Sequence, residues 1–96
     1  MKIEILDTAQ QDLIDGFQFY KNQTAGLGDY FLDSLFSDID SLYLYAGIHV
    51  VVFGYHRLLS KRFPFAIYYR VKAKTIFVYA VLDCRRDPAR MHKRLR

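Results

Sequence analysis

The segment from residue 56 to residue 90, HRLLSKRFPFAIYYRVKAKTIFVYAVLDCRRDPAR, constrains the fold more than any other part of this sequence. Aromatic and β-branched residues dominate it and alternate with polar ones, a pattern typical of strands. We expect three strands, at about residues 55–62, 65–71 and 75–83. Three residues, 72–74, are enough to close a hairpin, so the second and third strands should be antiparallel neighbours.

In the third of these strands both faces are apolar. A strict alternation would place Ile76, Val78, Ala80 and Leu82 on one face and Phe77, Tyr79 and Val81 on the other. Both faces are therefore expected to be at least partly covered. Asp87-Pro88 follows, a helix cap with proline at the first helical position, and predicts a short basic helix over residues 89–95.

Upstream of this segment the apolar residues follow the helical period. One stripe runs through Leu13, Ile14, Phe17 and Tyr20, and a second runs through Phe31, Leu35, Ile39, Leu42 and Ala46. Gly26 and Gly28 mark a turn between the two helices, and Gly47 is the expected stop. A short strand at residues 2–6 should precede them, with Asp7-Thr8 as cap and Gln10 or Gln11 at capping-box spacing. The sequence predicts an α+β fold in which a helical hairpin packs on one face of an antiparallel sheet.

Length and composition limit the architecture. Ninety-six residues form one domain, and 52% apolar residues with 8 Phe and 8 Tyr are enough for a core without metal or disulfide support. Cys84 is the single cysteine, so a reducing cytoplasm is the expected compartment. No signal peptide is visible, and the longest uncharged stretch, residues 41–55, is too short to cross a membrane.

The charge is divided unevenly along the chain. Residues 1–55 hold 2 Lys/Arg against 8 Asp/Glu, net −6, whereas residues 56–96 hold 12 against 2, net +10, which gives the overall +4. A basic half of this kind suggests a polyanionic target, either nucleic acid or an acidic protein segment. A solvated basic face without a partner is the alternative.

Two phrases carry a resemblance to a known family. RFPFAIYYRV at residues 62–71 and AVLDCRRDP at residues 80–88, in this order of elements, resemble the RelE/ParE superfamily of bacterial toxins, and more closely its ParE branch of plasmid-stabilisation proteins. The resemblance spans nearly the whole chain. It implies a toxin of a type II toxin–antitoxin pair, with a co-encoded antitoxin, acidic or amphipathic, as its partner.

The superfamily contains two activities with different chemical needs. Resemblance to RelE implies ribosome-dependent cleavage of mRNA, which requires a proton acceptor and cations around the cleaved phosphate. Resemblance to ParE implies inhibition of DNA gyrase, which requires only a binding surface. At the positions that match the catalytic residues of RelE-type nucleases, this sequence has Arg57, Arg86 and His92. The two other positions, which are basic in those nucleases, are Leu59 and Ala66 here. Lys61 and Arg70 remain possible substitutes, because a shift of one residue turns a strand over. Gyrase inhibition is therefore favoured, and mRNA cleavage is the alternative.

The candidate binding residues for a target or antitoxin are basic. They are Lys61, Arg70, Arg85, Arg86 and Arg90. Arg85 and Arg86 could instead fix the last strand to the helix, and Arg70 could be a structural cation paired with Asp83. His92 is the best candidate for proton transfer, with simple solvent exposure as the alternative. His49 and His56 have no ligands at metal spacing, and no cofactor is indicated. A harmless interaction module with the same fold is the third functional class.

Overall fold

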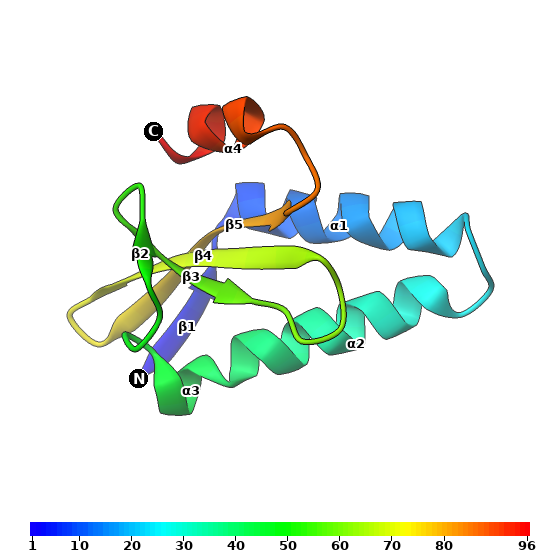
Figure 1. Ribbon diagram of the computed structural model, residues 1–96. Helices are drawn as coiled ribbons and strands as arrows, with labels where there is room; N and C mark the ends of the chain where they lie inside the picture. Colours follow the sequence, from blue (N-terminus) through cyan, green and yellow to red (C-terminus); the bar gives the residue numbers. More distant parts are fainter.

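The computed structural model describes residues 1–96 and contains a five-stranded sheet with helices on both faces (Figure 1). The elements in chain order are β1 (Lys2–Ile5), α1 (Asp7–Lys21), α2 (Leu27–Asp40), α3 (Leu42–Tyr45), β2 (Val51–Val52), β3 (Tyr55–Leu59), β4 (Phe65–Lys72), β5 (Thr75–Asp83) and α4 (Pro88–Leu95). The strand order is β1-β5-β4-β3-β2. β1 lies parallel to β5, and the other pairs are antiparallel, so the sheet is mixed. The α+β class predicted from the sequence is confirmed.

The main core lies between the helical hairpin and one face of the sheet. Both predicted stripes contribute to it: Leu13 and Tyr20 from α1, and Phe31, Leu35 and Ile39 from α2. The sheet supplies a matching set of buried residues, Phe65, Ile67, Tyr69, Ile76, Val78 and Val81. Burial of this apolar surface is the main force that holds the hairpin on the sheet.

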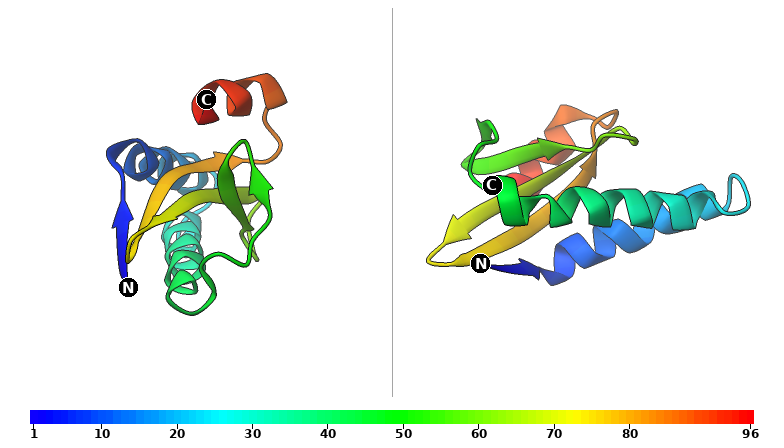
Figure 2. Two further views of the ribbon diagram at one scale, coloured as in Figure 1. Left: turned by 90° about the vertical axis from the view of Figure 1, so that its left-hand side faces the viewer. Right: turned by 90° about the horizontal axis from the view of Figure 1, so that it is seen from below.

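A smaller core lies on the opposite face, under α4. It consists of Tyr55, Ala66, Tyr68, Ala80 and Leu95, of which only Leu95 comes from the helix. Asp87 caps α4 as predicted, since its Oδ1 accepts a hydrogen bond from the Ala89 amide at 2.9 Å, and Pro88 occupies the first turn. Figure 2 shows α4 on the far side of the sheet from α1 and α2. Both sheet faces are therefore covered.

A β-bulge changes which residues of β5 face each core. The pairing of β4 with β5 shifts between Tyr68, which pairs with Ala80, and Tyr69, which pairs with Val78. Ile76 and Val78 accordingly face the helical hairpin together with Val81, whereas Tyr79, Ala80 and Leu82 belong to the α4 side. The strict alternation expected for β5 is wrong, because one extra residue in the strand inverts the order of the faces after it.

Local hydrogen bonds move several predicted boundaries. The predicted cap at Asp7-Thr8 does not form: α1 has no side-chain cap, Thr8 donates to the Tyr79 carbonyl, and Gln10 donates to the Ile5 carbonyl. The second predicted helix breaks at Ser41, whose hydroxyl donates to the Asp38 carbonyl at 2.6 Å and so competes with the helical backbone.

The first predicted strand of the sheet segment is shorter than expected. It ends at Leu59 instead of residue 62. The Ser60 amide still donates to the Phe65 carbonyl, but the Phe65 amide donates to the Phe63 carbonyl instead of completing the pair, and the Ser60 hydroxyl donates to Asp38. Gly47 ends α3 with a φ of 95°, a conformation that glycine adopts without strain.

Candidate functional site

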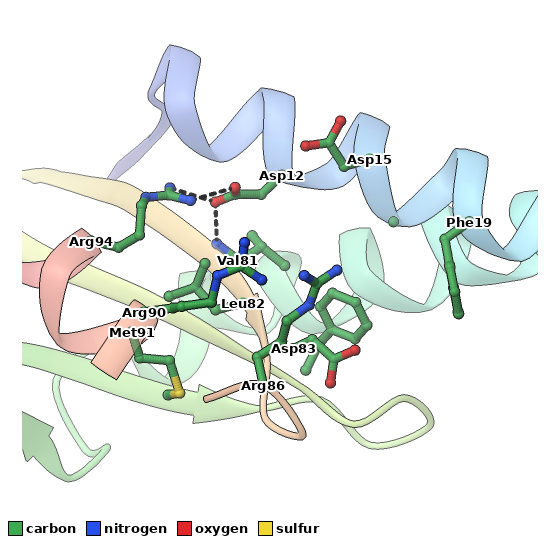
Figure 3. Close-up of a pocket in the computed structure, with 12 residues that line it drawn as sticks. Asp12, Asp15, Phe19, Val81, Leu82, Asp83, Arg86, Arg90, Met91 and Arg94 are labelled. Carbon is green, nitrogen blue, oxygen red and sulfur yellow. Dashed lines mark hydrogen bonds and ion pairs between the residues drawn. The ribbon is translucent and has the colours of Figure 1, made fainter. Parts of the chain in front are cut away.

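A pocket of about 360 Å³, lined by three arginines and three aspartates, lies between α1 and α4 (Figure 3). Asp12 and Asp15 line it from α1, and Arg90 and Arg94 line it from α4. Arg86, from the loop after β5, and the end of β5 close the remaining side. The acidic half of the chain and the basic half meet in this pocket.

Asp12 links the three elements around the pocket. Its two carboxylate oxygens accept hydrogen bonds from the Arg94 guanidinium at 2.8 and 2.9 Å, and Oδ2 also accepts one from the Val81 amide at 3.0 Å. The hydrogen bonds to Asp12 raise the pKa of Arg94 above its ordinary value. The Arg94 guanidinium is therefore engaged by Asp12 and joins α4 to α1.

Of the candidate binding residues at the end of β5 and in α4, Arg85 is held in an ion pair, whereas Arg86 and Arg90 line the pocket without one. Arg85 forms a bidentate ion pair with Asp83, in which Nη2 donates to Oδ2 at 2.8 Å and Nε donates to Oδ1 at 3.0 Å. These hydrogen bonds hold the pKa of Asp83 below its usual value. Arg86 and Arg90 make no ion pair, are exposed, and reach toward α1 in Figure 3. They are the cations available for an anionic group.

Arg57 lies on β3 directly opposite Tyr68 of β4, on the sheet face that α4 covers. Its Nε and the Tyr68 hydroxyl are buried and have no hydrogen-bond partner. Burial raises the pKa of Tyr68, and the neighbouring Arg57 partly opposes this effect. The pKa of Cys84 is also raised by burial, so its thiol is not an activated nucleophile.

The two positions that lack a cation, Leu59 and Ala66, are direct partners across β3 and β4. Arg57 and Leu59 are two residues apart on β3, and Ala66 and Tyr68 are two residues apart on β4, so all four side chains lie on one sheet face. Ala66 is fully buried, while Leu59 is 55% exposed. This face therefore offers Arg57 as its only basic side chain from these four positions.

The residues of the nuclease alternative are not brought together by hydrogen bonds. The His92 ring stacks on Phe53 in the turn between β2 and β3, with centroids 4.8 Å apart. Arg86 lies in the pocket beside α1, and Arg57 lies under α4. No hydrogen bond or ion pair joins any two of these three residues.

The other two candidates serve different roles. Arg70 does not pair with Asp83, so that expectation is wrong: its guanidinium lies 3.9 Å from the centre of the Tyr55 ring, and its Nε donates to the Gly54 carbonyl at 3.0 Å. Asp83 is instead engaged by Arg85. Lys61 is exposed in the loop between β3 and β4 and has no ion-pair partner.

The largest apolar groove is not next to the basic half. It has a volume of about 1060 Å³ and runs along β1, α1 and α2, where Ile14 and Phe36 are exposed. The charged residues that line this groove are acidic, Glu4 and Asp7. None of the helices is long and apolar enough to cross a membrane. No group of three or more His, Cys, Asp or Glu residues is placed to hold a metal ion.

The structure is a small α+β domain with a pocket lined by both arginines and aspartates. A search of solved structures finds this architecture in a chain described as "Chromosomal ParDE TA system from P. aeruginosa". The TM-score is 0.74 at 23% sequence identity, over 84% of this chain and 92% of the other. No family model and no curated protein matches the sequence.

This likeness confirms the fold expected from the two sequence phrases. The chain shares its fold with that P. aeruginosa chain: an N-terminal strand, a helical hairpin on the sheet and a short C-terminal helix. Sequence reasoning missed Asp12 as a site residue. Its position on the polar side of the first helical stripe was the available signal, but its partner is 82 residues away.

Proposed function

We propose that this protein is the toxin of a type II toxin–antitoxin pair and that it arrests growth by binding DNA gyrase. The ParE-like fold supports the toxin class, since the structurally similar P. aeruginosa chain comes from a ParDE toxin–antitoxin system. A cognate antitoxin is the expected partner, and the cytoplasm is the expected location because gyrase acts there.

The observation that carries the choice of mechanism is the pair Leu59 and Ala66. In-line cleavage of RNA needs several cations around the phosphate, and losing one such group typically costs a factor of about 100 to 1000 in rate. Around Arg57 these two positions supply only apolar side chains. A protein that binds gyrase has no such requirement.

The surface proposed to meet gyrase or the antitoxin is formed by Arg86 and Arg90. Both are unpaired and exposed at the mouth of the pocket, so each can form charge-assisted hydrogen bonds with a carboxylate or phosphate. Arg85 is a weaker candidate because Asp83 already engages it. Lys61 and Arg70 lie outside this pocket.

The test is growth arrest after induced expression, combined with gyrase supercoiling and mapping of mRNA cuts on ribosomes. Arg86→Glu with Arg90→Glu should abolish growth arrest and inhibition of supercoiling. Lys72→Glu with Lys74→Glu is the matched control, because it makes the same charge change on the exposed β4–β5 hairpin and should leave both effects intact.

Two results would contradict the proposal. Ribosome-dependent mRNA cuts that disappear in His92→Ala, with normal supercoiling, would establish the nuclease alternative. Folded protein that neither arrests growth nor affects gyrase would identify an interaction module without toxicity.

A further inference from the structure

An uncharged apolar strip forms the β2 edge of the molecule. We define the edge strip as residues 43–53, which include the end of α3, the loop after it, β2 and the start of the turn to β3. No Asp, Glu, Lys or Arg occurs in it. Seven of its apolar side chains are 52–80% exposed: Tyr43, Leu44, Tyr45, Ile48, Val50, Val51 and Phe53. Figure 2 shows this segment at the edge of the sheet opposite β1.

The strip ends in an open strand edge. β2 pairs with β3 on one side only, because it is the last strand of the sheet. Soluble proteins usually protect such an edge with charged residues, proline or a covering loop. β1, at the other edge, carries exposed Lys2 and Glu4, whereas β2 consists of Val51 and Val52 alone.

The backbone at Phe53 points to a contact role for this strip. Phe53 and Gly54 have φ values of 54° and 81°, the left-handed turn conformation that matches a tight hairpin. Glycine or asparagine adopts it easily, but for a bulky aromatic residue it is strained. Strain of this kind is often found at binding sites. One face of the Phe53 ring stacks on His92, yet the residue stays 52% exposed.

The size of the strip fits the needs of a stable dimer. An aromatic side chain buries about 150–250 Å² when fully covered. The strip's three aromatic residues are about half exposed and its four aliphatic residues are smaller but 57–80% exposed, so the seven offer roughly 100 Å² each, or about 700 Å². Standard interfaces bury about 800 Å² on each partner. A typical monomer exposes no apolar patch larger than about 300–600 Å².

We propose that the edge strip is the interface of a homodimer, in which two copies pair about a two-fold axis through β2. A two-fold interface brings one patch against itself, so the patch must be complementary to itself in charge. The strip contains no Asp, Glu, Lys or Arg, so it meets this condition. An acidic antitoxin segment would find no basic side chain in it. The proposal does not depend on the toxin function.

The experiment is sedimentation of the purified full chain at about 10 to 100 µM. The wild type should have twice the monomer mass of 11.3 kDa. Leu44→Glu with Ile48→Glu should return it to the monomer mass, since these side chains are 80% and 73% exposed and lie outside both buried cores. Ile14→Glu with Phe36→Glu is the matched control, with the same charge change on exposed apolar residues of the other groove, and should remain dimeric.

Hydrogen exchange of the wild type provides a second measurement that needs no variant. Protection of the amides of residues 50–53 should increase with protein concentration. A wild type that is monomeric at 100 µM would overturn the proposal, as would a dimer broken by the Ile14 and Phe36 variant but not by the Leu44 and Ile48 variant. Protection of the strip only when an antitoxin is bound would assign it to that partner instead.

Discussion

Asp12 and Arg94, 82 residues apart, form a bidentate ion pair that fastens the C-terminal helix to the first helix. Asp12 lies in the acidic half of the chain and Arg94 in the basic half. The same carboxylate accepts the Val81 amide hydrogen, so one side chain links α1, β5 and α4. The helix that carries Arg90 is therefore oriented by a residue near the start of the chain.

Removing the Asp12 carboxylate should destabilise the domain. Asp12→Ala leaves the Val81 amide without its partner, which typically costs about 1–3 kcal/mol in the free energy of unfolding. Arg94→Ala should cost less, because Asp12 keeps the amide. Urea denaturation measures both changes, and Asp15→Ala, on the same helix but exposed, is the control with a change below about 0.5 kcal/mol. Equal losses in the Asp12 and Arg94 variants would contradict this division of roles.

Ile39→Ala should lower the free energy of unfolding by about 2–5 kcal/mol, because Ile39 is 2% exposed in the main core and truncation leaves a cavity. In a domain of this size such a loss approaches the total stability. Thermal and urea unfolding provide the measurement, with exposed Asp33→Ala on the same helix as control. An unchanged melting temperature would show that this face of α2 does not pack on the sheet.

Gly16→Ala tests how closely α1 and α2 approach. A Cβ at Gly16 would clash with the ring of Phe31, which is fully buried. The ring or the helix must then move, and such overpacking typically costs about 1–3 kcal/mol. The expected loss is notable because alanine is otherwise the better helix former. Denaturation of the double variant Gly16→Ala with Phe31→Leu should recover part of the loss if the clash is its cause.

Stability should fall as the pH is lowered from about 7.5 to 5.5 because of His49. Burial, and secondly the neighbouring His56, lower the pKa of His49 below the ordinary value of 6.5. Below pH 6.5 the unfolded chain binds a proton at His49 more readily than the folded protein does. The contribution of neutral His49 to the free energy of unfolding is therefore present in full above pH 6.5, and it is lost as the pH falls through the pKa of His49 in the folded protein.

Melting temperatures at the two pH values measure this effect. His49→Gln should show a smaller decrease than the wild type, since it removes the titrating ring that hydrogen-bonds to the Tyr69 hydroxyl. The same pH dependence in both proteins would exclude His49 as its source.

The sequence by itself determined the elements that depend on local chemistry. Apolar residues at helical spacing located α1 and most of α2, and Ile39 was correctly placed in the core. Alternation located β4 and β5, and Asp87-Pro88 located the start of α4. The two phrases at residues 62–71 and 80–88 led to the correct fold because they lie in these elements.

The tertiary structure alone decided how the elements meet. The bulge at Tyr68 and Tyr69 reversed the faces of β5, which no local period reveals because a single extra residue inverts the alternation. The Arg70 guanidinium lies over the Tyr55 ring instead of pairing with Asp83. Asp12 forms an ion pair with Arg94, which the sequence did not indicate. Ion pairs and strand registers join residues far apart in the chain, so they are set by packing of the whole domain, whereas helix stripes and caps are set within a few residues.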